Sequence, residues 1–523
     1  MKCSHQDTVC CFLDIKKAYD TTFREGVWKR LLDVGINGKL WRVIRNLYAT
    51  VDSCVLLGAR FTDWFPVELG LRQGDTLSPI LYIIFIDGLV KEIKRAKEGV
   101  TVGPVKVNIT AFADDIALVA ASKAEMQCLL DRVHAYSRKW RFLFNVDKSK
   151  ILVFTSRRSN FDTSPLYLGI QRLVEVNSFR YLGVDFKSNL SWTLMKLRVA
   201  KKARSKLALI SKAVASGLMP VASLKMWYTL IRPTLEYAVG VWGIYRWPEA
   251  ERIQLELGRL ILGVSGKTAS DVIRGELGLW TMEGRLHLAI LRWWGKLVSM
   301  DRNRLCYKIY RYRREHIKAK HNSWCKAVRD LLIDLNLAHV WINEEIGDLK
   351  TWNDNAKLWI AQRENRNWKT RILEKSKLRL YRQVKSNLSF EDYLTEIPEL
   401  KYRREFTKIR SGTSDLRIET GRWLKEELED RTCCMCVKDL VEDESHFLLD
   451  CYPYESLRRK MFQQIRYRTG DTYRLWLMRD DRQWMVDTLI GDGLKDKKHR
   501  IIVRIAVSKF ILRAMRLRQR CVK

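Results

Sequence analysis

The apolar positions of roughly the first 190 residues follow two different periods. Val9–Ile15 is a short run of β-branched and aromatic residues, which is typical of a buried strand. Next, the pattern predicts a helical segment over Phe23–Tyr48, broken near Gly35 and Gly38, and a hairpin over 50–70. A helix is predicted over Ser78–Lys97, with Ser78 as N-cap and Pro79 at N1. The remaining predicted elements are strands over Val107–Ala113 and Ile116–Ala121, a helix over Lys123–Arg141, and strands over 150–155 and 179–186. Strands and helices interleaved in this way predict an α+β layer.

Beyond about residue 190 the period is mainly helical. Leu and Ile recur at helical spacing in a segment rich in Trp and Arg that extends to about residue 430. Loop signals cluster at Gly263–Lys267 and Ser386–Ser389, and a Cys/His segment over 433–451 precedes a basic tail. The sequence shows no clear internal repeat and no Gly/Ser linker, so the predicted boundaries are gradual.

The composition indicates folded domains with a polyanionic partner. Of the 523 residues, 47% are hydrophobic and 11% aromatic, which is enough for sizeable cores and argues against wholesale disorder. With 27 Gly and 9 Pro, a collagen-like or Pro-rich low-complexity chain is excluded. The formal charge of +35 indicates binding to nucleic acid or, alternatively, to an acidic membrane surface.

The sequence predicts neither a membrane span nor a secretion signal. The longest apolar run, Leu77–Val90, falls short of the roughly 20 residues that span a bilayer, and it contains Asp87. The start, Met1–Asp7, has no apolar signal-peptide core. The 12 cysteines are then typical of reduced thiols, so we expect a nuclear or cytoplasmic protein that is not secreted and has no transmembrane segment.

Basic residues are concentrated in four stretches. These are Lys196–Lys206 with Lys196, Arg198, Lys201, Lys202, Arg204 and Lys206; Arg302–Lys320, where Tyr307, Tyr310 and Tyr312 alternate with Lys308, Arg311, Arg313 and Arg314; Arg366–Arg382 with Trp368 and Tyr381; and Lys495–Lys523 with Arg504, Lys509, Arg513, Arg516, Arg518 and Arg520. Cations interleaved with aromatic rings suit phosphate contacts and base stacking. The alternative for any one stretch is a solvated helix face with aromatic residues in the core. Together, the four stretches predict a nucleic-acid surface.

Two sets of carboxylates stand at the ends of apolar, strand-like runs. Asp14 ends the first predicted strand, and Asp114 and Asp115 lie between two later ones. A buried strand rarely carries a carboxylate without a partner, because an unpaired buried charge is costly. Three converging carboxylates require a cation, and two Mg²⁺ ions about 4 Å apart stabilise in-line nucleotidyl transfer. The alternative is that the two sets are unrelated turn residues.

The Cys/His segment has the spacing of a zinc site. The pattern C-x2-C-x9-H-x4-C comprises Cys433, Cys436, His446 and Cys451. Three thiolates and one imidazole suit a closed tetrahedral Zn²⁺ site. Cys434 is the alternative first ligand, and free core cysteines near an unrelated histidine are the alternative to a metal site.

Further motifs, in this order, give the chain a family resemblance. Leu71-Arg72-Gln73-Gly74-Asp75-Thr76-Leu77-Ser78-Pro79 lies between the carboxylate sets, and Asn145-Val146-Asp147-Lys148-Ser149-Lys150 and Phe179-Arg180-Tyr181-Leu182-Gly183-Val184 follow them. With Phe112-Ala113-Asp114-Asp115, this order resembles the palm of a reverse transcriptase from a non-LTR (LINE-type) retrotransposon. Arg274-Gly275-Glu276-Leu277-Gly278, Leu416–Arg422 and the Cys/His segment resemble the C-terminal halves of such proteins, so the resemblance covers nearly the whole chain.

This resemblance implies an α+β polymerase palm, an antiparallel sheet with helices, followed by a mainly α-helical thumb and C-terminal region with a small zinc knuckle. The implied domains are a palm with partial fingers at 1–187, a helical thumb at 188–265, a helical basic region at 266–429, a CCHC zinc knuckle at 430–455 and a basic helical tail at 456–523. In similar elements the knuckle holds one structural Zn²⁺ and helps to bind nucleic acid.

The resemblance also implies catalytic roles. Asp14 and Asp114, assisted by Asp115, would hold two Mg²⁺ ions that help deprotonate the primer 3′-hydroxyl and neutralise the leaving pyrophosphate. Lys148 matches a lysine that protonates or stabilises the pyrophosphate. A solvated loop lysine is the alternative for that position.

Other residues match the nucleotide-binding part of the family. Tyr19 matches the aromatic residue that closes the sugar pocket against a 2′-hydroxyl, with an ordinary core aromatic as the alternative. Arg72, Gln73 and Gly74 match the turn that lines the nascent base pair, where glycine permits close backbone approach. The hairpin Tyr181-Leu182-Gly183 matches the grip on the primer end.

The implied function is RNA-directed DNA polymerisation, with an RNA template, a DNA primer or target, and dNTPs as partners. The sequence departs from the family because the aspartate strand begins within fifteen residues of Met1, whereas basic fingers and an endonuclease precede it elsewhere in the family. We therefore expect a truncated element copy or an incomplete gene prediction. The alternatives are a catalytically inactive remnant that only binds nucleic acid, and an RNA-directed RNA polymerase, which Tyr19 and Phe112–Asp115 fit less well.

Overall fold

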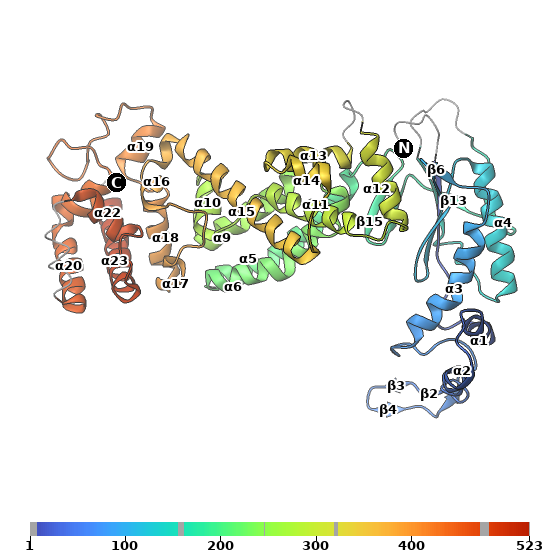
Figure 1. Ribbon diagram of the computed structural model, residues 1–523. Helices are drawn as coiled ribbons and strands as arrows, with labels where there is room; N and C mark the ends of the chain where they lie inside the picture. Colours follow the sequence, from blue (N-terminus) through green and yellow to red (C-terminus); the bar gives the residue numbers. More distant parts are fainter. Residues whose placement is uncertain (1–7, 155–161, 245, 318–322, 471–480, 522–523) are drawn as a thin grey trace. The chain divides into compact units, whose positions relative to one another are not determined.

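A computed structural model describes residues 8–154, 162–244, 246–317, 323–470 and 481–521 (Figure 1). The chain divides into two compact units, one of Met1–Lys196 with Asp301–His316 and the other of Leu197–Met300 with Ile317–Lys523. From the predicted basic stretches, 318–320 and 522–523 lie outside the described residues, as does the start of the chain before Thr8.

The first unit combines a five-stranded sheet with helices and short hairpins. Its elements are β1 (Thr8–Leu13), α1 (Arg24–Asp33), α2 (Gly38–Asn46), β2 (Asp52–Ser53), β3 (Leu56–Leu57), β4 (Arg60–Phe61), β5 (Phe65–Pro66), α3 (Ser78–Lys94), β6 (Val100–Val102), β7 (Val105–Val107), β8 (Ile109–Phe112), β9 (Asp115–Ala120), α4 (Lys123–Lys139), β10 (Lys150–Phe154), β11 (Tyr167–Leu168), β12 (Gln171–Arg172), β13 (Val174–Glu175), β14 (Ser178–Tyr181), β15 (Val184–Lys187) and α12 (Leu305–Glu315). The strand order is β13-β10-β1-β9-β8, and β1 runs antiparallel to both of its neighbours. The predicted combination of a sheet with helices is confirmed.

Strand β1 is the centre of this sheet and is buried on both faces. All six of its residues are buried. Because alternate side chains of a strand point to opposite faces, Val9, Cys11 and Leu13 pack in the core that includes residues of α3 and α4, while Cys10 and Phe12 pack toward the β14–β15 hairpin. This double burial explains why the strand reads as a continuous apolar run rather than as an alternating one.

Helix α3 begins at the predicted residue, but the prediction that Ser78 is its N-cap is wrong. The N-cap position is Leu77, which makes no side-chain capping bond. Ser78 is the first helical residue, is fully buried, and shares a 3.0 Å hydrogen bond with the Tyr48 hydroxyl. A partner 30 residues away in the sequence therefore takes the hydroxyl that local rules assign to the cap.

Helix α12 carries part of a predicted nucleic-acid stretch, and it packs within the first unit. Tyr312 lies over Gly103 in the turn between β6 and β7, where a Cβ would come within 2.2 Å of its ring. Tyr310 is buried, and the Tyr312 ring stacks on His316 at 4.2 Å. Two of the three tyrosines in this stretch thus serve packing, which was the alternative considered from the sequence.

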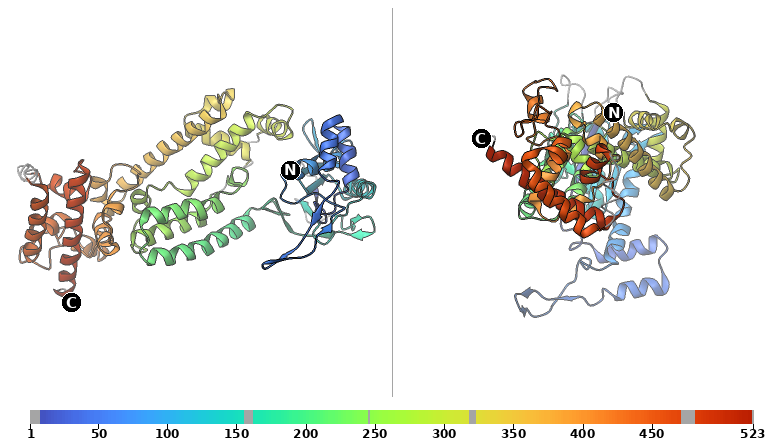
Figure 2. Two further views of the ribbon diagram at one scale, coloured as in Figure 1. Left: turned by 90° about the horizontal axis from the view of Figure 1, so that it is seen from below. Right: turned by 90° about the vertical axis from the view of Figure 1, so that its left-hand side faces the viewer.

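The second unit is helical. Its elements are α5 (Thr193–Ala215, whose first residues belong to the first unit), α6 (Pro220–Met226), η1 (Trp227–Ile231), α7 (Arg232–Glu236), α8 (Val239–Trp242), α9 (Pro248–Leu262), α10 (Ser270–Leu277), α11 (Met282–Val298), α13 (Trp324–Asp334), α14 (Ala338–Asn343), α15 (Leu349–Leu373), η2 (Ser376–Leu378), α16 (Tyr381–Val384), α17 (Tyr393–Glu396), α18 (Leu400–Arg410), α19 (Arg417–Trp423), η3 (His446–Asp450), η4 (Tyr452–Tyr454), α20 (Glu455–Thr469), α22 (Arg482–Ile490) and α23 (Lys497–Cys521). Helices α20 and α23 pack side by side (Figures 1 and 2). Within the described ranges, no helix is long and apolar enough to cross a membrane.

A buried arginine connects distant segments of this unit. Arg410, at the end of α18, is fully buried and lies 2.7 Å from Glu391 and 3.4 Å from Glu276 of α10. It also donates to the carbonyl of Ile490 in α22. Burial opposes ionisation of Glu391, yet Arg410 and Lys385 lower its pKa below the ordinary value. Glu276, part of a motif that resembles the family's C-terminal half, thus has a structural partner.

Replacing Arg410 by Leu should strongly destabilise the second unit. The change leaves Glu276 and Glu391 buried without their shared cation, which typically costs about 3–5 kcal/mol. The free energy of unfolding, measured by urea denaturation, should fall by this amount.

Arg459→Leu is the matched control. Arg459 pairs with Glu455 on the surface of α20, with 69% of its side chain exposed. Exposed pairs contribute about 0–1 kcal/mol, so equal losses for the two variants would contradict the interpretation of Arg410.

Candidate active site and metal site

The register of the sheet brings the three predicted aspartates to one end. Leu13 of β1 faces Ile116 of β9, so Asp14 and Asp115 come next to each other along the two strands. Phe112 pairs with Asp115 across the β8–β9 turn, which leaves Asp114 at its tip. All three carboxylates are partly exposed. The three aspartates are therefore neighbours at one end of the sheet.

The charges of this group act on one another. Burial, followed by the nearby carboxylates of Asp114 and Asp14, raises the pKa of Asp115 above its ordinary value. Three acidic groups with this mutual repulsion favour a bound cation, because an opposite charge stabilises their ionised forms. The three carboxylates are less tightly gathered than the Cys/His cluster described below. In the described part of the chain, that cluster is the one group of potential metal ligands whose atoms all lie within 4.8 Å of one another.

The loop before β10 holds Asp14 in place and contributes Lys148. The backbone N–H of Asn145 donates to the Asp14 carbonyl at 2.8 Å, and the Asp14 N–H donates to the Ser149 hydroxyl at 3.2 Å. Lys148 Nζ lies 3.8 Å from Asp14 Oδ2, with 70% of its side chain exposed. The structure thus places Lys148 beside the aspartates. Ser149, buried and bound to Asp14, was missed as a separate site residue.

Tyr19 lies five residues beyond Asp14 and contacts the Leu71–Pro79 motif. The Leu71 N–H donates to the Tyr19 carbonyl at 2.7 Å. Gly70, with φ of 81°, lies so close that a Cβ would come within 2.6 Å of that carbonyl. The Tyr19 ring is partly buried and stacks on Tyr82 of α3, with centroids 5.2 Å apart. Glycine at residue 70 is therefore required for the two segments to approach.

The predicted turn residues have three different environments. Gln73 donates from Nε2 to Asp20 Oδ1 at 2.6 Å. Gly74 has a φ of 87°, a conformation that favours glycine. Arg72 donates to the Leu47 carbonyl at 2.7 Å, at the end of α2. Gln73 thus lies next to the Asp14–Asp20 segment, whereas the Arg72 guanidinium anchors the turn to α2.

The β14–β15 hairpin supports the aspartate end of the sheet from the other face. Phe179 stacks on Phe12 of β1 at 4.5 Å with an interplanar angle of 14°. The Tyr181 hydroxyl donates to the Asp115 carbonyl at 3.1 Å. The predicted primer-grip hairpin therefore contacts the strand that carries Asp115.

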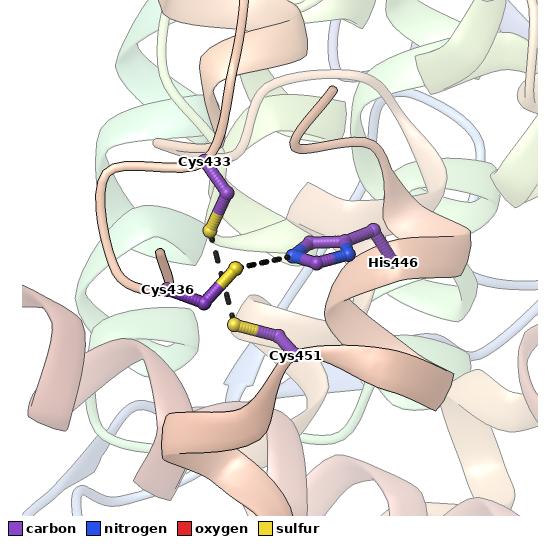
Figure 3. Close-up of side chains that lie close together, drawn as sticks. All are labelled: Cys433, Cys436, His446 and Cys451. Carbon is purple, nitrogen blue, oxygen red and sulfur yellow. Dashed lines mark hydrogen bonds between the residues drawn. The ribbon is translucent and has the colours of Figure 1, made fainter. Parts of the chain in front are cut away.

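The four predicted zinc ligands converge in the second unit (Figure 3). Cys433 Sγ and Cys451 Sγ are 3.8 Å apart, Cys436 Sγ and His446 Nε2 are 3.5 Å apart, and all four ligand atoms lie within 4.8 Å of one another. A tetrahedral ion with Zn–S near 2.3 Å and Zn–N near 2.0 Å would place two sulfurs about 3.8 Å apart and a sulfur and a nitrogen about 3.5 Å apart. The donor set therefore fits zinc, and Cys434 is not part of it.

The surrounding segments shape this cluster. A hydrogen bond with Cys451 is the largest influence that lowers the pKa of Cys433, to about 3, against the effect of burial. The Met435 N–H also donates to Cys433 Sγ at 3.4 Å. Buried Arg458 donates to the carbonyls of Leu448 and Cys451, which fixes the turn after His446. Thiolate-stabilising hydrogen bonds of this kind favour metal ligation.

Glu442 connects the cluster to two helices. This carboxylate is fully buried and accepts from the Arg417 N–H of α19 at 2.8 Å and from Arg518 Nη2 of α23 at 2.6 Å. Its backbone N–H donates to the Arg431 carbonyl. The Cys/His segment is therefore built into the helical unit.

An arginine-lined groove of about 1100 Å³ lies beside the Cys/His cluster. Its lining residues are Asp415, Arg417, Thr420, Cys434, Arg516, Arg518, Gln519 and Arg520. Arg516 and Arg520 are exposed, whereas Arg518 is buried against Glu442 and Arg417 pairs with Glu426 at 2.6 Å. The positive charge of this groove thus comes from two exposed arginines, Arg516 and Arg520, and from two arginines that are paired with glutamates of the protein, Arg518 and Arg417.

Several other residues that were predicted to contact nucleic acid have partners within the protein. In α5, Arg204 pairs with Glu249 and Glu256, and Lys206 donates to the Leu230 carbonyl. Arg504 of the tail is fully buried against Glu396 and Asp492, and Trp368 and Tyr381 belong to the core. For Arg504, Trp368 and Tyr381 the prediction that they face nucleic acid is wrong, because all three side chains are buried. Arg204 is exposed and its acidic partners are at least partly exposed, so its contact with nucleic acid stays a prediction.

Two residues that contact these sites were not predicted from the sequence, namely Tyr82, which stacks on Tyr19, and Glu442, which connects the Cys/His segment to two helices. Tyr82 stands in an apolar helix pattern and has no motif signal of its own. Glu442 lies inside the recognised Cys/His segment, where an acidic residue between two zinc ligands could have suggested a partner cation.

A known protein family matches the first part of the chain. Residues 1–186 match the family described as reverse transcriptase (RNA-dependent DNA polymerase). Among solved structures, apo telomerase from Candida tropicalis overlaps 69% of this chain and 54% of its own at 10% identity, with a TM-score of 0.29, which is too low to support an argument.

Relatives from mobile elements extend this match. The chain is 28% identical over 183 residues to the Pol polyprotein of the type-1 retrotransposable element R2 of Popillia japonica, covering 34% of this chain and 30% of that protein. It is 25% identical over 281 residues to the RNA-directed DNA polymerase of the mobile element jockey of Drosophila funebris, covering 49% and 28%. The chain thus spans less than a third of the length of these relatives. Residues 1–186 thus match the reverse transcriptase family, and the relatives that align with this part of the chain are proteins of retrotransposable and mobile elements.

Proposed function

We propose that this chain is an RNA-directed DNA polymerase that adds dNTPs to a primer 3′-end on an RNA template. The observation that carries the proposal is the strand register that sets Asp14 beside Asp114 and Asp115. The match to reverse transcriptases supports the reaction type, and the mobile-element relatives support an RNA template and a DNA primer or target.

The aspartates are the residues that would hold two Mg²⁺ ions. Such ions promote attack by the primer 3′-hydroxyl and neutralise the leaving pyrophosphate. The backbone of Asp14 is held by Asn145 and Ser149, and that of Asp115 by the Tyr181 hydroxyl, so the chain that carries the two carboxylates is positioned before substrates bind.

Lys148 and Tyr19 complete the proposed nucleotide site. Lys148 lies close enough to Asp14 to contribute positive charge where pyrophosphate leaves. The Tyr19 ring would limit the space for a 2′-hydroxyl, and Gln73 and Gly74 would line the nascent base pair. Arg72 serves this site by anchoring the turn at Leu47.

Replacing Asp114 by Asn should abolish polymerisation while leaving the fold intact. The change removes one negative charge from the cation site, which should lower primer extension on a poly-RNA template with Mg²⁺ by at least about 100-fold. Asp131→Asn, an equal charge change at an exposed residue of α4, should keep wild-type extension. Equal, background-level signals from wild type and Asp114→Asn would leave only the remnant that binds nucleic acid.

We propose further that Cys433, Cys436, His446 and Cys451 hold one structural Zn²⁺. The ligand distances, which suit tetrahedral coordination, support this assignment. The bound ion would hold the segment between Cys433 and Cys451 closed and so stabilise the attachment through Glu442.

Purified protein should contain about one zinc per chain by plasma mass spectrometry. Cys451→Ser should remove the metal and lower the melting temperature, because zinc binding contributes to folding free energy. Cys434→Ser is the matched control, because it changes a neighbouring exposed thiol outside the ligand set. Loss of zinc in the control alone would reverse the ligand assignment.

The arginine-lined groove is the nucleic-acid contact that we propose in the second unit. Exposed Arg516 and Arg520 supply phosphate-binding charge beside the Cys/His cluster. A double change to Ala should weaken binding of a single-stranded RNA and reduce the slope of log affinity against log salt by about 1.4, since two phosphate contacts are lost.

A control double variant, Arg459→Ala with Lys460→Ala, removes two exposed cations of α20 outside the groove. It should change the salt slope little. Fluorescence anisotropy over a salt series measures both variants, and identical slopes would exclude the groove as the contact.

A further inference from the structure

Tyr82 of α3 lies directly behind the residue that we propose as the sugar gate. Its ring stacks on the Tyr19 ring with centroids 5.2 Å apart and an interplanar angle of 25°. Only 1% of Tyr82 is exposed, whereas Tyr19 is partly exposed. One face of the Tyr19 ring is therefore backed by a ring that belongs to the core.

The polar end of Tyr82 is unusual for such a buried residue. Its hydroxyl is buried and has no hydrogen-bond partner among the described residues. Burial, and to a smaller extent the Asp114 carboxylate, raise the pKa of Tyr82 well above its ordinary value, so the hydroxyl stays protonated. Buried hydroxyls normally find a partner, so packing at this position takes precedence over hydrogen bonding.

We infer that Tyr82 is a positioning residue for nucleotide selection: its ring fixes the plane of Tyr19, and Tyr19 in that plane excludes a 2′-hydroxyl. This inference rests on the proposed polymerase function. A stacked aromatic pair prefers a narrow range of ring orientations, whereas an aliphatic side chain behind Tyr19 would let its ring tilt. A tilt that opens the sugar pocket lowers the discrimination between deoxynucleotides and ribonucleotides. It does so without removing any of the proposed metal ligands.

The test compares incorporation of dGTP and GTP on one RNA template by Tyr82→Leu, Tyr82→Phe and wild type. Tyr82→Leu should lower the ratio of kcat/KM for dGTP over GTP by at least about tenfold, mainly through a lower KM for GTP. Tyr82→Phe keeps the ring, so its ratio of kcat/KM for dGTP over GTP should stay within about threefold of the wild-type ratio. Both nucleotides are measured on the same preparation, so a partly unfolded variant changes both rates and leaves their ratio intact.

Phe85→Leu is the matched control. Phe85 is one turn further along α3 and is equally buried, but its ring packs edge-on against Trp140 and Phe142. It should lose stability and keep wild-type selectivity. Unchanged selectivity in Tyr82→Leu, or an equal loss in Phe85→Leu, would overturn the role of Tyr82. Absence of dGTP extension by wild type would instead overturn the proposed function, and this inference with it.

Discussion

Strand β1 is buried on both faces and bonded to a neighbour on each side, so the end of the strand is where it can carry a charge. Asp14 occupies that end, and the antiparallel neighbour β9 starts there with Asp115. The Asn145–Lys150 loop then binds the end of β1 at Asp14, and the β14–β15 hairpin binds the start of β9 at Asp115. The apolar core thus determines where three repelling carboxylates meet, and that meeting point determines which chemistry the domain supports.

Features with a local signature could be predicted from the sequence. The buried strand, the start of α3 and the four converging Cys/His residues each depend on spacing within a short segment. Contacts between distant segments could not be predicted. Nothing near Glu276 indicates Arg410, and nothing near Tyr19 indicates Tyr82, because each pair forms only when separate helices or strands pack. The wrong cap at Ser78 has the same cause, since Tyr48 provided a competing partner.

The distribution of buried charges shows where the excess positive charge of the protein lies. Among the described residues, ten buried Lys and Arg side chains accompany nine buried Asp and Glu side chains. The interior is therefore nearly neutral, although arginines such as Arg410 and Arg504 lie deep within it. The surplus positive charge of the described residues must then lie almost entirely outside the core, where it can attract a polyanion. Individual basic stretches are poor guides to that surface, because they mix internal and external cations.

Glu442 connects the Cys/His cluster to the arginine-lined groove. This residue lies between the proposed ligands Cys433 and His446 in the sequence, and its carboxylate also fixes Arg518, whose neighbours Arg516 and Arg520 line the groove. If zinc holds this segment closed, an RNA bound in the groove must by thermodynamic reciprocity increase the affinity for zinc by the same factor by which zinc increases the affinity for RNA. Zinc occupancy would then depend on whether RNA is bound in the neighbouring groove, and removal of zinc by a chelator would weaken RNA binding there without acting on the palm.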